Sequence, residues 1–135
     1  MPSKRVLSLG QCAADHFTIR RLLADHFGAE VAGADTPRAA LDELRRQPYD
    51  LVLVNRQLAR GGSGLDFIAR LKADAALGRV PVILVSDRAG AQQQAETLGA
   101  LPGFGKAALD DPATLGRLGT ALGDDRPPAT VGTAG

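Results

Sequence analysis

The feature that most constrains the fold is an apolar run that stops at a polar residue and a glycine-rich loop. Leu51–Val54 is uninterrupted aliphatic sequence, and Asn55 follows it directly. The loop ends in GGSG, and a helical pattern starts at Leu65. An unbroken aliphatic run of this length indicates a strand that is covered on both faces, as in the centre of a parallel sheet. Because ligands of such sheets bind beyond the carboxyl ends of the strands, Asn55 marks the expected functional edge.

Strand and helix patterns alternate five times along the chain. The predicted strands are 5–9, 30–34, 51–54, 80–85 and 101–105. Asp15 is interpreted as the N-cap of the first helix, because its carboxylate can accept a bond from a first-turn amide. Thr36 and Asp111 each precede a proline and predict two further helix starts. We therefore predict an α/β fold with a five-stranded parallel sheet and helices on both faces.

Composition limits the domain count, the partners and the compartment. The 135 residues predict one domain over residues 1–122, and residues 123–135, which have little to bury, predict a disordered C-terminal tail. A net charge of +1 gives no general attraction to nucleic acid or to a membrane surface. The single cysteine, Cys12, excludes an internal disulfide and fits a reducing compartment. Without a signal peptide or a spanning segment, we expect a cytoplasmic protein.

Three stretches carry a resemblance to a known family: DLVLVN, GLDFIARLKAD and VPVILVS. Together with Ser86 and Lys106 at later strand ends, they resemble the receiver domain of two-component response regulators over roughly residues 4–122. The resemblance implies a flavodoxin-like (βα)5 receiver fold. It also implies an acidic pair after the first strand, a phospho-accepting aspartate after the third, a hydroxyl after the fourth and a lysine after the fifth.

The chain departs from this pattern where the chemistry lies. The acidic pair is replaced by Gly10 and Gln11, and the acceptor position holds Asn55. A neutral amide oxygen is a poor nucleophile, and magnesium needs hard, preferably anionic oxygen ligands. We therefore expect a relict pocket without metal, cofactor or catalysis, in which Lys106 meets no acid because Asp15 lies too far along the chain. Its residues are Gly10, Gln11, Asn55, Gln57, Ser86 and Lys106.

The family's conformational switch is also altered. The resemblance implies an aromatic switch residue three positions before the lysine, but this position holds Gly103. Phe104, one position later, should point to the opposite face of the strand. The position after the lysine, where the resemblance implies a proline, holds Ala107. The loop after Asn55 is one residue longer than the family's loop. These departures favour a pseudo-receiver, meaning a receiver fold that works as a binding platform without aspartyl phosphorylation.

The partner of such a platform would be a signalling kinase, a regulator or a second copy of the chain in a homodimer. The resemblance implies an interaction face on the fourth helix, the fifth strand and the fifth helix. Its candidate residues here are Gln92, Gln93, Phe104, Gly116 and Gly119. The alternative is a small-anion or nucleotide-binding flavodoxin-like protein that uses Lys106, Ser86 and the strand-end amides. An active phosphotransfer receiver is the third hypothesis, and it is disfavoured because the Asn55 amide cannot accept a phosphoryl group.

Overall fold

The computed structural model describes residues 4–58 and 62–123. They form one parallel sheet in the order β2-β1-β3-β4-β5, which confirms the predicted α/β architecture of flavodoxin-like type. The strands are β1 (Arg5–Leu9), β2 (Glu30–Ala34), β3 (Leu51–Asn55), β4 (Val82–Val85) and β5 (Leu101–Phe104). The helices are α1 (Ala13–Phe27), α2 (Pro37–Arg46), α3 (Gly64–Ala73), α4 (Ala89–Thr97) and α5 (Pro112–Ala121), with a 3₁₀ turn over Lys106–Ala108.

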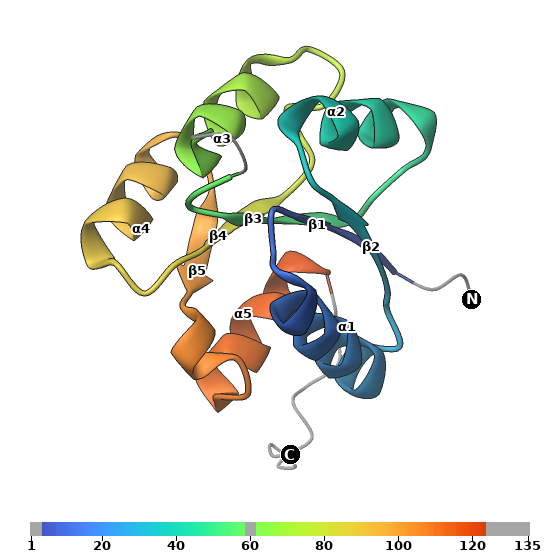
Figure 1. The fold of residues 1–135 in the computed structure, drawn as a ribbon, viewed down its shortest axis with the longest axis vertical. Helices are drawn as coiled ribbons and strands as arrows, with labels where there is room; N and C mark the ends of the chain where they lie inside the picture. The colour runs from blue at the N-terminus through green and yellow to red at the C-terminus, as the bar shows by residue number, and fades with distance from the viewer. Residues whose placement is uncertain (1–3, 59–61, 124–135) are drawn as a thin grey trace.

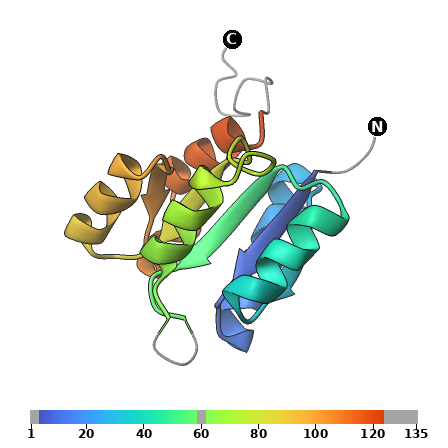
Figure 2. The same cartoon turned by 90° about the horizontal axis from the view of Figure 1, so that it is seen from above.

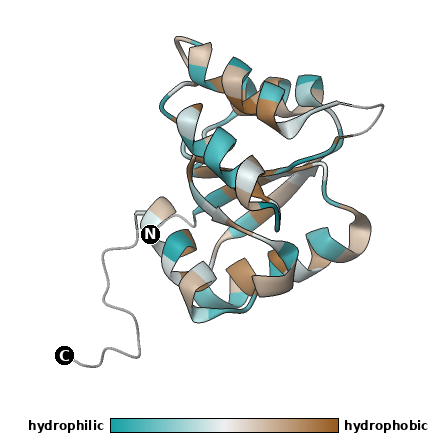
Figure 3. Cartoon of the chain, turned by 90° about the vertical axis from the view of Figure 1, so that its left-hand side faces the viewer, coloured by the Kyte–Doolittle hydropathy of each residue, from teal (hydrophilic) through white to brown (hydrophobic). Residues whose placement is uncertain are grey.

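The sheet separates two helical layers. Helices α1 and α5 cover one face, and α2, α3 and α4 cover the other (Figures 1 and 2). Leu51 and Leu53 of β3 pack with α1 and α5, whereas Val52 and Val54 pack with α2, α3 and α4. All four side chains are 0% exposed, so the aliphatic run is the doubly covered central strand that was predicted. Around the helices, polar and apolar residues alternate (Figure 3).

Helix α1 begins earlier than predicted. Its N-cap is Cys12, whose sulfur accepts a hydrogen bond from the Asp15 amide at 3.4 Å. The prediction that Asp15 itself caps the helix is wrong, because this residue already lies in the first helical turn. Thr36 does cap α2, since its hydroxyl accepts from the Ala39 amide at 3.1 Å. Asp111 precedes α5, but its side chain makes no capping bond.

Other boundaries differ by small amounts. Strand β4 begins at Val82, after Pro81, and the Pro81 carbonyl accepts from the Val52 amide at 2.9 Å. Gly123 follows α5 with a φ of 69°, a conformation that favours glycine. The predicted disordered tail is 123–135, and all of it except Gly123 lies outside the described residues, so it stays a prediction. No helix in the described part of the chain is long and apolar enough to cross a membrane.

A polar cluster lies at the opposite, amino edge of the sheet, where the chain enters β3. The Tyr49 side chain is buried, and its hydroxyl donates to a carboxylate oxygen of Glu43. Burial is the main cause that raises the pKa of Tyr49 to about 12, and the hydrogen bond to Glu43 is the second cause. The Tyr49 hydroxyl, with help from Arg46, lowers the pKa of Glu43 to about 2.

This cluster predicts a titration that can be read directly, because Tyr49 is the only tyrosine and the chain has no tryptophan. At about pH 11 the native chain should show much less phenolate absorbance than the urea-unfolded chain, whose tyrosine pKa is about 10. Glu43→Gln should move the native titration down in pH, since it removes the negative charge beside the phenol. Asp42→Asn, on the exposed side of the same helix, is the control and should leave it unchanged. Equal native and unfolded titrations would contradict the assignment.

Candidate functional site

A pocket of about 260 Å³ opens at the carboxyl ends of β3, β4 and β5. We call it the carboxyl-edge pocket, and its lining residues are Asn55, Arg56, Gln57, Val85, Ser86, Asp87, Arg88 and Lys106. The structure thus brings together four residues of the predicted relict pocket, which are Asn55, Gln57, Ser86 and Lys106. Gly10 and Gln11 do not line it.

The space beside Gly10, which we call the corner at Gly10, is filled by the Leu58 side chain. No sequence pattern indicated this contact. A Cβ atom at Gly10 would lie 2.4 Å from Cδ2 of Leu58 and 3.5 Å from Cβ of Asn55. Gly10 also has a φ of 81°, so a larger residue would be strained there. Leu58 is only 6% exposed and packs in the core on the α2–α3–α4 side. A side chain at Gly10 would therefore require the Leu58 methyl to move and would hold a strained backbone.

Hydrogen bonds across the loop after Asn55 bring Leu58 to this place. Gln57 forms an antiparallel bridge with Ser63, and the Leu58 amide donates to the Gly62 carbonyl at 2.8 Å. The chain thus turns back on itself and directs Leu58 inward. The expected extra residue in this loop is the one sequence signal here, and it does not show which side chain turns inward.

Gln11 has a different environment from the one predicted. Both its side-chain oxygen and its side-chain nitrogen are buried, and neither has a hydrogen-bond partner among the described residues. It lies outside the carboxyl-edge pocket.

Lys106 forms an ion pair with Asp15, with 2.7 Å between Nζ and Oδ2. The expectation that Asp15 lies too far away is wrong, because the early start of α1 places this residue in the first helical turn. Lys106 is the main cause that holds the pKa of Asp15 below its ordinary value, and the Cys12 thiol adds to the effect. Asp87 is a second acid, in the pocket lining itself. The expected acid-free pocket is therefore corrected.

The charges around the pocket suit an anion better than a divalent cation. The lining holds three cations, Arg56, Arg88 and Lys106, and the carboxylate of Asp87. With Asp15, which pairs with Lys106, the formal charge is +1. Among the described residues, no three His, Cys, Asp or Glu side chains lie close enough to share a metal ion.

The residues at the acceptor position do not fit the magnesium ion that the fold family implies. The neutral amide of Asn55 donates to the Gln57 carbonyl at 2.9 Å, and Leu58 fills the corner where a carboxylate would stand. Magnesium prefers anionic oxygen ligands in octahedral geometry, which this corner does not offer.

Gln92 was predicted on the interaction face, but its amide turns inward. Its Nε2 donates to the carbonyls of Leu84 at 2.8 Å and Ser86 at 3.0 Å, and lies 3.5 Å from the Phe104 carbonyl. The space is available because Gly103 has no side chain, and a Cβ there would lie 2.6 Å from Oε1 of Gln92. Gln92 therefore ties α4 to the ends of β4 and β5.

Phe104 also lies in the interior, at 4% exposure, so its assignment to a surface is wrong. The register of β5 shifts between the pairs Ile83–Leu101 and Val85–Phe104, and Phe104 packs with α1 and α5. As predicted, it faces away from the α4 side. The added residue of the bulge gives β5 this register.

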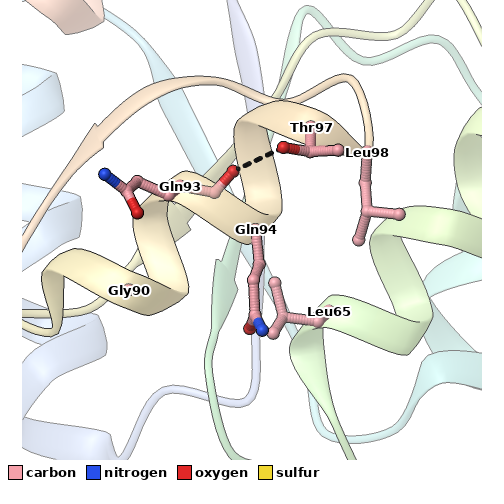
Figure 4. A pocket seen from close by; sticks show the side chains of 6 residues that line it. All are labelled: Leu65, Gly90, Gln93, Gln94, Thr97 and Leu98. Carbon is pink, nitrogen blue, oxygen red and sulfur yellow. Dashed lines mark hydrogen bonds between the residues drawn. The ribbon is translucent and has the colours of Figure 1, made fainter.

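The rest of the predicted interaction face is divided. Gly116 is exposed and has open space around it, whereas Gly119 faces α1, where a Cβ would lie 3.4 Å from the Phe27 ring. Gln93 is exposed and lines a groove between α3 and α4 (Figure 4). The other residues of this α3–α4 groove are Leu65, Gly90, Gln94, Thr97 and Leu98.

Comparison with solved structures finds the same fold in bacterial signalling proteins. The chemotaxis response regulator CheY4 of Vibrio cholerae is 18% identical, with a TM-score of 0.69, over 90% of this chain and 98% of that chain. A putative response regulator from Chloroflexus aurantiacus is 17% identical with a TM-score of 0.78, over 90% and 99% of the two chains. The receiver domain of a DNA-binding response regulator from Colwellia psychrerythraea is 20% identical with a TM-score of 0.77, again over 90% and 99%.

The sequence comparisons address the family. The search of curated proteins gave no match. The family model described as response regulator receiver domain matches residues 12–102, which is more than half of the 135 residues. With the β2-β1-β3-β4-β5 sheet and the polar edge at Ser86 and Lys106, this match shows that the chain belongs to the response regulator receiver domain family of two-component signalling.

Proposed function

We propose that this receiver domain is a pseudo-receiver, a protein-interaction module that signals without aspartyl phosphorylation. The observation that carries the proposal is the Leu58 side chain in the corner at Gly10, where the family would hold a metal-binding carboxylate. Asn55 beside it has no carboxylate to accept phosphorus. Without a nucleophile and without a cation to neutralise the transferred group, both requirements of phosphoryl transfer are missing.

Lys106 supports the same conclusion. In the family this lysine binds the phosphoryl group, but here the Asp15 carboxylate already occupies it at 2.7 Å. The ion pair connects α1 to the end of β5 and needs no ligand. A carboxylate of the chain itself thus takes the place of the added charge.

Gln92 supports an output that does not depend on phosphorylation. Its bonds to the Leu84 and Ser86 carbonyls hold α4 against the sheet, where the family's switch would rearrange. With Gly103 in place of the aromatic ring, no side chain remains there to swing. The module would present one constant surface to a signalling kinase, a regulator or a second copy, in the cytoplasm that the lone cysteine favours.

The alternative, a nucleotide-binding protein, has less support. Lys106 is engaged by Asp15, and the strand-end amide of Ser86 donates to the Phe104 carbonyl at 2.9 Å. The carboxyl-edge pocket, at about 260 Å³, is also below the range of roughly 300–1,000 Å³ that is typical for organic ligands.

Incubation with acetyl phosphate and magnesium tests the proposal by intact mass. We expect no added phosphoryl group on the chain. The single variant Asn55→Asp should also stay largely unmodified, because Leu58 still fills the space beside Gly10 where the family would hold a metal-binding carboxylate. A phosphoryl adduct on the unaltered chain at Asp15 or Asp87 would refute the pseudo-receiver.

The role of Gln92 is tested by Gln92→Ala. Losing its bonds to buried carbonyls should cost about 1–2 kcal/mol of unfolding free energy. It should also speed amide hydrogen exchange at the start of α4. Gln93→Ala is the matched control, because its exposed side chain should contribute within about 0.5 kcal/mol. If both variants exchange and unfold alike, Gln92 does not hold α4.

The ion pair is tested by Asp15→Asn over a range of pH. Asp15 has a lowered pKa in the folded chain, so its contribution is present above the unfolded pKa of about 3.9 and is lost as the pH falls through the folded value. Because the Lys106 side chain is 37% exposed, solvent screening limits the effect at neutral pH to below about 1 kcal/mol.

Chemical denaturation at several pH values measures this effect. The stability gap between the native chain and Asp15→Asn should close in acid, whereas Asp110→Asn, at an exposed position, should show little gap at any pH. A gap that stays constant into acid would argue against the ion pair.

A further inference from the structure

We propose that the carboxyl-edge pocket receives one carboxylate side chain, Asp or Glu, from a partner protein and holds it with Arg56, Arg88 and Ser86. This inference rests on the proposed function in that it names the chemistry by which the module would recognise its partner.

Arg56 and Arg88 are the uncommitted cations of the pocket. Lys106 is paired with Asp15, but neither arginine makes an ion pair with any described residue. Both line the same pocket, one from the end of β3 and the other from the turn before α4. Guanidinium groups bind carboxylates through two parallel hydrogen bonds, so this pair is suited to a planar anion.

Backbone and hydroxyl donors point to the same ligand class. The Ser86 hydroxyl oxygen accepts from the Arg88 amide at 3.1 Å, which leaves its hydrogen free to donate into the pocket. Arg88 is the N-cap residue of α4, and no side chain caps this helix. The amides of its first turn are therefore open to an acceptor from outside, and a carboxylate is a favoured group at a helix N-terminus.

The charge balance selects a carboxylate over a phosphate. Three cations and the carboxylates of Asp15 and Asp87 leave a formal charge of +1 at the site. One carboxylate would neutralise this charge, whereas a phosphate dianion would leave an excess negative charge beside Asp87.

A partner protein is favoured over a free small acid because binding has an entropic cost. Association costs several kcal/mol, roughly 4–15 by common estimates, so the charged contacts of a free acid would give only weak binding. The α3–α4 groove offers the further contact that a protein needs, since its Gly90 lies two residues after Arg88 and its Leu98 is 36% exposed (Figure 4). An acidic residue near an apolar one would fit both surfaces.

The experiment is an NMR titration of the ¹⁵N-labelled chain with blocked single residues at low salt. N-acetyl-aspartate amide is the probe, N-acetyl-asparagine amide is its neutral control, and inorganic phosphate is the free-anion arm. We expect weak, saturable shifts at 55–57 and 86–90 with the aspartate probe, and none with the asparagine control. Arg56→Gln with Arg88→Gln should weaken binding at least tenfold, since each charged bond is worth roughly a factor of ten or more.

Arg79→Gln, an exposed arginine outside the pocket, should bind as the native chain does. Arg88→Lys keeps the charge but loses the paired geometry, so it should bind more weakly than the native chain. Equal shifts with both blocked residues, binding of phosphate alone, or no saturable shift at all would overturn the inference. Any of these results with no phosphoryl adduct would leave the pseudo-receiver intact, whereas an adduct from acetyl phosphate would remove both.

Discussion

The burial of β3 on both faces is the constraint on which the rest of the structure depends. Leu51 and Leu53 need α1 and α5 above them, and Val52 and Val54 need α2, α3 and α4 below. Full burial of such side chains contributes roughly 1.5–3 kcal/mol each. Here β3 is parallel to both neighbours and is followed by a crossover helix, and the parallel order of the sheet places all five carboxyl ends at one edge. The carboxyl-edge pocket exists because the sheet is built like this.

At that edge, the positions that lost their family groups are occupied by neighbouring side chains. Leu58 fills the corner at Gly10, Asp15 pairs with Lys106, and Gln92 occupies the space beside Gly103. Protein interiors are close-packed, so a missing group is replaced by whatever side chain can reach the space. The three side chains come from different elements: Leu58 fills the space beside Gly10, Asp15 pairs with Lys106, and Gln92 bonds α4 to the sheet. Neither Arg56 nor Arg88 makes an ion pair with a described residue, and this is why we expect recognition rather than chemistry at this edge.

Several site residues could not be predicted, and each case has a physical reason. The inward turn of Leu58 depends on hydrogen bonds across its loop, such as that from its amide to Gly62, and loop length does not reveal them. The reach of Asp15 depends on where α1 begins, and Cys12 is a weaker capping signal than the aspartate itself. From the sequence, Gln92 is a polar residue of a weak helix and is expected to be solvated. Its role depends on the carbonyls of Leu84 and Ser86, which only the packing of α4 on the sheet brings beside it.

The sequence by itself determined the order of strands and helices, the central position of β3 and the absence of a carboxylate at Asn55, Gly10 and Gln11. These features follow from periodicity and residue type, which act over a few neighbouring positions. Only the tertiary structure decided which side chains meet at the edge, because residues as distant as Asp15 and Lys106 are brought together by the packing of α1 and β5 on one sheet. Contacts between such distant residues depend on rotations and offsets of whole elements, and no local pattern encodes them.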